Sequence, residues 1–178
     1  MKNSDDFRLY QRELELIYMQ NPIECELYSI VACLIRERNQ NKKISLRDVS
    51  TRRKSEFSGS EIYASKSGFP DFVILSEDFY LFDDKFRDTS KILGAVEIKR
   101  MTVKLNGKSK QLLDHIAKFK KVLYTNGFEW RLYNGNKSYA PEWLVSLGKI
   151  DKGKVEWFEG EVWDSLLNEL DKISWETY

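Results

Sequence analysis

The chain has 178 residues, of which 42% are hydrophobic and 32% are charged, and its formal net charge is +1 at pH 7. This length and composition predict one folded domain, residues 1–178, with a sizeable core. The near-neutral charge argues against a protein that binds polyanions over its whole surface, and no apolar run is long enough to cross a bilayer, so we expect no membrane partner.

The two cysteines and the single histidine argue against a disulfide-bonded or zinc-binding protein. Cys25 and Cys33 fall on one predicted helix, about 12 Å apart at ~1.5 Å per residue, which is too far for a disulfide. The sequence contains no cluster of Cys and His residues of the kind that binds zinc. The polar start MKNSDDFRLYQ is unlike a signal peptide. We therefore expect a cytoplasmic protein with reduced thiols.

Helices precede strands in the first half of the chain. Apolar residues recur at helical spacing over residues 5–20, and again from Asn21–Pro22 as far as about Arg38. Alternating or continuous apolar runs then predict strands at residues 44–50, 71–75 and 92–100, with a further short strand at Ile62–Ala64.

The second half begins with a helix that Ser109 caps and that ends near Lys121. Strands flank the Asn126–Gly127 turn, and a late strand over 154–160 and a helix over Val162–Leu170 close the chain. This order predicts an α/β fold in which helices pack on a mixed central sheet. The residues expected to face inward from the Ser109 helix are Leu112, Leu113, Ile116, Ala117 and Phe119.

Two strands carry charged residues that an ordinary buried strand would not contain. In AVEIKR, residues 95–100, Glu97 and Lys99 share one face because strand side chains alternate. Asp71 follows Pro70 at the start of another apolar strand. Two carboxylates that converge beside a lysine would bind a hard divalent cation such as Mg²⁺. The alternatives are an exposed salt bridge at Glu97 and a turn role for Asp71.

Pro70-Asp71 followed by Glu97-Ile98-Lys99 resembles the motif of the PD-(D/E)xK nuclease superfamily, which has the restriction-endonuclease-like fold. The αβββαβ core order of that superfamily fits residues 22–134 or thereabouts. The resemblance implies a metal-dependent endonuclease acting on DNA or RNA. It assigns Asp71, Glu97 and the carbonyl of Ile98 to Mg²⁺, with Mn²⁺ as a substitute, and it assigns Lys99 to the attacking water.

The resemblance extends to the flanking helices. Members often carry a third acid on the first core helix, and here Glu24 lies closer to the apolar face than Glu26 does; both could instead be solvated acids in a first turn. Gln111 in SKQLLDHIAKF occupies the place of a supporting glutamine. His115 follows where relatives often have tyrosine, and we expect it to be partly buried, with a nucleic-acid contact as the alternative.

The strand pair LYTNGFEWRLYN is similar to one in the nuclease domains of type I restriction enzymes. A second acid-lysine group, Asp83–Lys85, could be aligned as the second half of the motif. We reject it because no buried strand follows it; otherwise Asp83 or Asp84 would replace Glu97.

Charge is distributed unevenly along the chain. Residues 99–121 contain eight basic residues and one acid, Asp114, whereas residues 156–176 are acidic. A basic segment beside a metal site favours contact with a phosphate backbone, although a solvated surface is the alternative. Thr51–Lys54 is a second basic cluster. The candidate nucleic-acid contacts are Arg100, Lys104, Lys108 and Lys110.

The acidic C-terminal segment is predicted to pack on the sheet, with a protein partner or a homodimer interface as the alternative. For the whole chain, the alternative to a nuclease is an inactive module that binds nucleic acid or protein on the same fold. Small nuclease cores are typical of phages and mobile elements. The resemblance therefore implies a role in restriction, recombination or counter-defence, for example anti-CRISPR cleavage of a guide RNA within a rival ribonucleoprotein.

Overall fold

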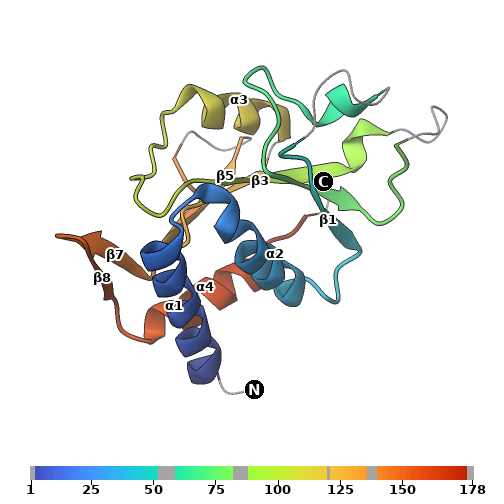
Figure 1. Cartoon of the computed structure of the whole chain (residues 1–178). Coiled ribbons are helices and arrows are strands. Elements are labelled where there is room, and N and C mark those ends of the chain that lie inside the picture. Colours follow the sequence, from blue (N-terminus) through green and yellow to red (C-terminus); the bar gives the residue numbers. More distant parts are fainter. Residues whose placement is uncertain (1–2, 52–58, 82–87, 120, 136–139, 176–178) are drawn as a thin grey trace.

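The computed structural model describes residues 3–51, 59–81, 88–119, 121–135 and 140–175 (Figure 1). Apolar residues at helical spacing form four α-helices, and short 3₁₀ turns are named η. The helical elements are α1 (Asn3–Gln20), η1 (Glu24–Glu26), α2 (Leu27–Arg38), η2 (Ser60–Tyr63), η3 (Thr89–Lys91), α3 (Lys110–Phe119) and α4 (Glu161–Lys172).

The strands form a six-stranded sheet with the order β1-β2-β3-β4-β5-β6 and a separate hairpin, β7-β8. Only the β3–β4 pair of the sheet is parallel. A parallel pair needs a crossover, and α3 provides it. The predicted α/β class is therefore confirmed. The bounds are β1 (Ile44–Asp48), β2 (Phe72–Ser76), β3 (Ile92–Ile98), β4 (Lys121–Thr125), β5 (Glu129–Asn134), β6 (Trp143–Ser146), β7 (Gly148–Asp151) and β8 (Lys154–Trp157).

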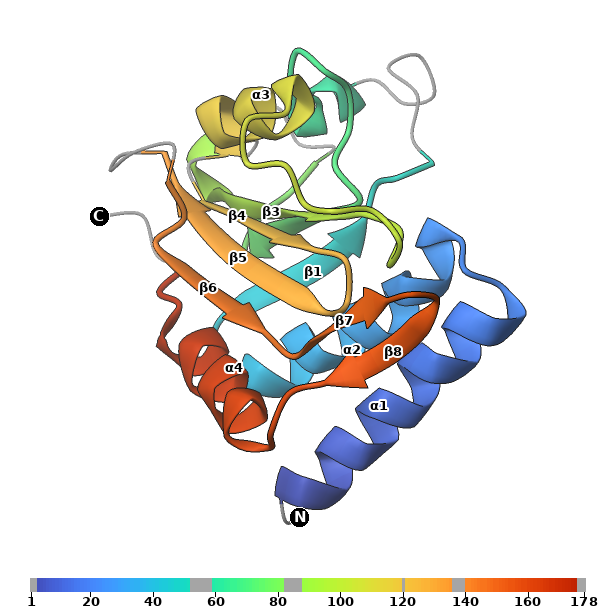
Figure 2. The ribbon, with the colours of Figure 1, turned by 90° about the vertical axis from the view of Figure 1, so that its left-hand side faces the viewer.

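Helices cover both faces of the sheet. Figures 1 and 2 show α1, α2 and α4 below the sheet and α3 above it. The core is split in the same way, because Val96 and Ile98 of β3 pack with the three lower helices, whereas Ala95 packs on the α3 side. Alternation then directs Glu97 toward α3.

The register of β2 and β3 determines which charged residues meet. These antiparallel strands pair Phe72 with Val96. Continuing this register by one residue, back from Phe72 and forward from Val96, places Asp71 opposite Glu97, and residues paired in this way are close neighbours.

Several predicted elements were wrong in detail. The helix predicted to start after Asn21–Pro22 is broken, since Ile23 is extended and η1 forms a tight 3₁₀ turn before α2 begins, as is common at helix ends. Ile62 lies in η2 instead of a strand, where it packs against the α3-side core. Ala117 is exposed instead of buried.

Two strands were missed altogether. β6 pairs only with β5, so it is an edge strand, and none of its four side chains is fully buried. β7 has four residues and alternates weakly between apolar and charged side chains. In the described part of the chain, no helix has the length and hydrophobicity that a bilayer crossing would need.

Candidate functional site

Asp71 and Glu97 meet at one end of the sheet. Asp71 immediately precedes β2 and Glu97 is the penultimate residue of β3. Their side chains are almost inaccessible, because Asp71 is 7% exposed and Glu97 is 2% exposed. Burying two carboxylates side by side is unfavourable unless protons, cations or hydrogen bonds compensate the charge.

Asp71 is held from two directions. Its Oδ2 accepts a hydrogen bond of 2.6 Å from the backbone N–H of Ile98, and its Oδ1 accepts one from the hydroxyl of Tyr28 on α2. Burial, and next the charge of Glu97, raise the pKa of Asp71 to about 7, although the hydrogen bonds from Tyr28 and Ile98 act in the opposite direction. Asp71 therefore holds a proton more tightly than an exposed aspartate does.

Lys99 lies directly beside Glu97. Its Nζ is 2.5 Å from Oε1 of Glu97 and 3.0 Å from Oε1 of Gln111 on α3. Burial tends to lower the pKa of Lys99, but the nearby charge of Glu97, together with Glu24 and Asp71, raises it overall. Lys99 is thus a fixed positive charge that can orient or neutralise an anion, and it is a poor proton acceptor.

The two candidate third acids occupy different surroundings. Burial raises the pKa of Glu24, while the Lys99 charge and the backbone N–H of Arg100 lower it and the Glu97 charge raises it. Glu24 is therefore close enough to feel both charges of the motif. Glu26 is exposed, and it accepts a hydrogen bond of 2.8 Å from Asn21.

The donors at this end of the sheet suit a hard divalent cation. Carboxylate and carbonyl oxygens are the ligands that Mg²⁺ takes, and Mg²⁺ usually keeps several waters and needs only one or two carboxylates. Oε2 of Glu97 is buried and makes no aligned hydrogen bond. Among the described residues, however, no three acidic, histidine or cysteine side chains converge as a ready-made metal cluster. The residues present would fit a cation that Asp71 and Glu97 would hold together with water.

The basic loop, residues 99–109, leaves this site on the way to α3. Asn126 donates a hydrogen bond of 2.9 Å to the carbonyl of Val103, and Arg131 donates one of 3.3 Å to that of Leu105. The turn after β4 and the strand β5 thus brace the loop. The exposed basic residues on or next to it are Arg100, Lys104, Lys108 and Lys110.

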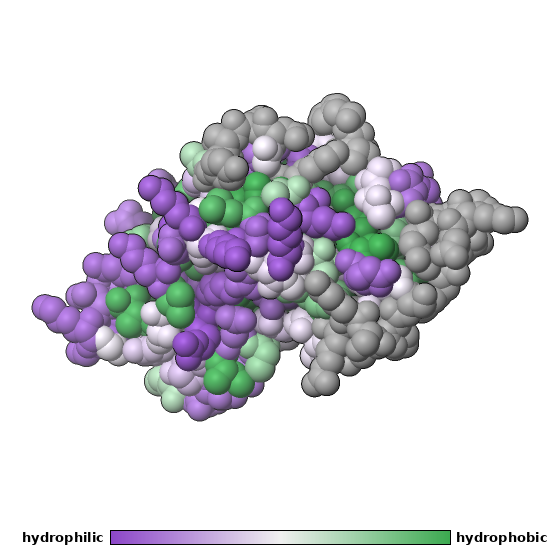
Figure 3. Space-filling model, turned by 90° about the horizontal axis from the view of Figure 1, so that it is seen from above, coloured by the Kyte–Doolittle hydropathy of each residue, from purple (hydrophilic) through white to green (hydrophobic). Residues whose placement is uncertain are grey.

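Hydrophilic side chains dominate the described surface seen from above α3, and the apolar areas between them are small (Figure 3). That face therefore offers hydrophilic groups to a partner in place of a broad apolar contact. Within the basic cluster Thr51–Lys54, only Thr51 is described, and the Asp83–Lys85 group lies outside the described residues.

Two residues of the site were missed from the sequence. His115 is fully buried, and its Nε2 is 3.2 Å from Oε2 of Glu97; the expectation of a partly buried histidine, and the alternative of a nucleic-acid contact, are wrong. Tyr28 was not considered. The sequence does not mark either contact, because the partners of Tyr28 and His115, which are Asp71 and Glu97, lie on other elements of the fold.

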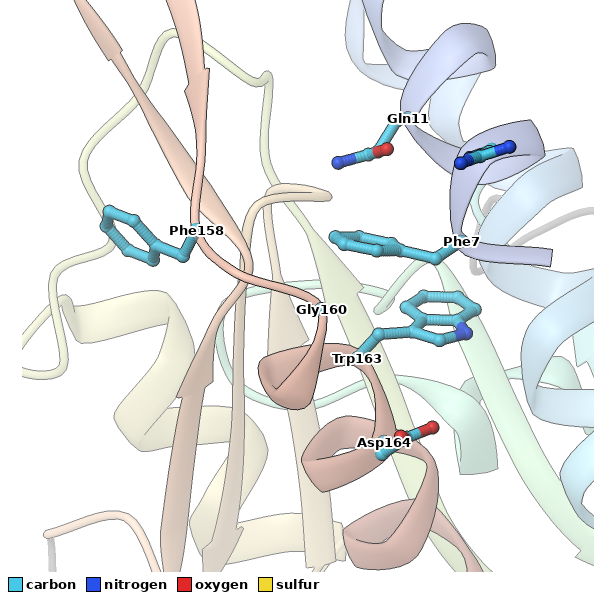
Figure 4. Close-up of a pocket in the computed structure, with 7 residues that line it drawn as sticks. Phe7, Gln11, Phe158, Gly160, Trp163 and Asp164 are labelled. Atoms are coloured by element: carbon cyan, nitrogen blue, oxygen red, sulfur yellow. The ribbon is translucent and has the colours of Figure 1, made fainter. Parts of the chain in front are cut away.

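One cavity of about 380 Å³ lies elsewhere, between α1 and the turn that precedes α4 (Figure 4). Phe7 stacks on Trp163 beside it, with ring centroids 5.2 Å apart. Asp164 is the single acidic residue among those that line this cavity, so the cavity does not offer paired carboxylates. It is lined by Phe7, Arg8, Gln11, Phe158, Gly160, Trp163 and Asp164.

Comparison with known proteins shows a likeness of fold alone. No family model matches the chain, and no curated protein matches it. The chain is similar in structure to a chain of the cryo-EM structure of a DrdV–DNA complex, with a TM-score of 0.54 and 13% sequence identity. The similarity covers 94% of this chain but only 14% of that one.

Proposed function

We propose that this protein is a metal-dependent nuclease that hydrolyses phosphodiester bonds. The observation that carries the proposal is the convergence of Asp71, Glu97 and Lys99 at one end of the sheet, where two buried acids lie beside a fixed ammonium. An ion pair that served stability alone would not need a second buried acid, because extra buried charge destabilises a fold.

Each residue has a distinct role in this proposal. Asp71, Glu97 and the backbone carbonyl of Ile98 would hold Mg²⁺, or Mn²⁺ in its place, with Glu24 contributing through water. The bound ion would polarise the phosphate and lower the pKa of a water molecule. Lys99 would position the attacking water and neutralise charge that develops on the phosphate. Gln111 would hold Lys99 in place through their 3.0 Å hydrogen bond.

DNA is the substrate that we propose first. The structural neighbour comes from a complex with DNA, and a basic loop next to the acids suits a phosphate backbone. Arg100, Lys104, Lys108 and Lys110 are exposed and would contact that backbone. These contacts carry no base specificity, so we expect cleavage with little sequence preference.

A panel of labelled nucleic acids tests the proposal. Single- and double-stranded DNA and RNA of one sequence are incubated with the protein in Mg²⁺, in Mn²⁺ and in EDTA, and the products are separated on denaturing gels. We expect DNA cleavage that EDTA abolishes. If only RNA is cleaved, RNA is the substrate of the same chemistry. Binding without cleavage in any metal would instead indicate an inactive nucleic-acid-binding module.

A further inference from the structure

His115 is a polar side chain that is fully inaccessible. It lies on the inner face of α3, with the ring of Phe119 6.0 Å away and Nε2 3.2 Å from Oε2 of Glu97. Although this separation suits an ion pair or hydrogen bond, neither atom makes a well-aligned hydrogen bond, and Nδ1 is also without one.

Three unsatisfied polar atoms in one buried place require an explanation. Buried side-chain nitrogen and oxygen atoms are nearly always hydrogen-bonded, since an unmade bond costs roughly 1–3 kcal/mol. An apolar residue at position 115 would avoid most of that cost. Contacts at catalytic sites are often misaligned without ligands and tighten when the complex forms. The pair His115–Glu97 has this character.

The geometry also divides the two oxygens of Glu97 between different partners. Oε1 faces Lys99, whose side chain is 21% exposed, and Oε2 faces His115, which is inaccessible. Oε1 is therefore the oxygen on the solvent side. Gln111 and His115 lie about one helical turn apart on α3. From this helix, His115 approaches Glu97 directly, and Gln111 contacts Lys99, which in turn contacts Glu97.

We propose that His115 is a positioning residue that fixes the carboxylate of Glu97 for the metal ion, an inference that rests on the proposed function. The Nε2–H tautomer donates to Oε2 and prevents the carboxylate from rotating, which leaves Oε1 available to the cation. Hydrogen-bond partners outside the ligand set commonly orient metal ligands in this way, and their loss typically costs about 10–100-fold in metal affinity.

Metal affinity measured without substrate tests this role. Mn²⁺ is titrated calorimetrically into wild type, His115→Phe, which keeps a ring but removes the donor, and His115→Gln, which keeps an N–H donor near the position of Nε2. Ile116→Val is the matched control, because it loosens the neighbouring buried position on α3 without touching Glu97. Each variant is first melted in EDTA to establish that it folds.

We expect His115→Phe to bind Mn²⁺ about 10–100-fold more weakly, with a melting temperature in EDTA at or above that of wild type. His115→Gln should recover most of the affinity, and Ile116→Val should change it little. Wild-type affinity in folded His115→Phe would overturn the positioning role but leave the nuclease proposal intact. If wild type itself binds no Mn²⁺, both proposals fail. Should His115→Phe not fold, unrecovered affinity in folded His115→Gln would overturn the positioning role.

Discussion

The carboxylate of Asp71 accepts a hydrogen bond of 2.6 Å from the backbone N–H of Ile98, the residue between Glu97 and Lys99. This contact joins the two halves of the candidate motif across the β2–β3 pair. It also forces Asp71 to stay beside Glu97, although each is a buried acid. The testable consequences follow from that enforced proximity.

The first prediction concerns stability in the absence of metal. Because Asp71 has a higher pKa when folded, about 7 against 3.8, the folded chain holds the proton more tightly. Stability is therefore fully present below pH 4 or so and is lost as pH rises through about 7. In Asp71→Asn the amide oxygen can accept from Ile98 and its NH₂ can donate to Tyr28. We expect it to be more stable than wild type by about 1–3 kcal/mol at pH 8.

Urea denaturation in EDTA at pH 4 and pH 8 measures this difference, which should disappear at pH 4. Glu77→Gln is the control, because Glu77 is exposed just beyond the other end of β2. Added Mg²⁺ should stabilise wild type but not Asp71→Asn. A variant that is less stable than wild type at pH 8 would contradict the raised pKa.

The second prediction separates Lys99 from the metal ligands. Lys99→Met removes the ammonium beside Glu97 but keeps a similar apolar stem. We expect the cleavage rate to fall about 10²–10³-fold, as for loss of a group that stabilises transition-state charge. Mn²⁺ affinity should not fall, because a neighbouring positive charge is gone. Single-turnover rates and calorimetry measure the two effects, and loss of metal binding would contradict the assigned role.

The third prediction uses the two neighbouring acids of η1 as a matched pair. Glu24 feels the charges of Lys99 and Glu97, whereas Glu26 is exposed and bonded to Asn21. Glu24→Gln should weaken Mn²⁺ binding several-fold and slow cleavage, and Glu26→Gln should alter neither. Equal effects of the two substitutions on metal affinity would show that η1 contributes only general negative charge.

The fourth prediction concerns the basic loop. Replacing Lys104 and Lys108 by glutamine removes two exposed charges. If both contact phosphates, the slope of log affinity against log salt should fall by about 1 per lysine. Lys43→Gln/Lys172→Gln is the control, since these lysines adjoin the contact of Lys42 with the carbonyls of Asp171 and Ile173 at the end of α4, away from the basic loop.

Fluorescence anisotropy of labelled duplex DNA in EDTA at several salt concentrations measures these slopes without cleavage. We expect the control pair to retain the wild-type slope. An unchanged slope in the loop variant would show that DNA contacts a different surface of the protein.

Part of this site could be predicted from the sequence. Strand alternation placed Glu97 and Lys99 on one face, and the apolar run after Asp71 marked the partner strand. Tyr28 and His115 could not be assigned, because their partners lie on other elements and only tertiary packing brings them together. The η1 turn was missed for a related reason, since the helical pattern of residues 22–38 does not reveal that Ile23 is extended.

The edge of the sheet was the hardest part to predict. In β6 three residues are half-buried and Leu144 is exposed, so the strand lacks the alternation that marks a strand with one buried face. The hairpin β7-β8 is anchored from a distance, because Trp157 donates a hydrogen bond of 2.7 Å to Glu15 on α1. Such long-range contacts leave no periodic trace in the sequence.

The most direct measurement is the single-turnover rate of Mg²⁺-dependent cleavage of duplex DNA by wild type and by Asp71→Asn, with Glu77→Gln as the control. We expect cleavage by wild type and Glu77→Gln, and none by Asp71→Asn although that variant is folded and more stable at pH 8. Cleavage by Asp71→Asn at the wild-type rate would contradict the assignment of Asp71 and Glu97 as the metal-binding pair.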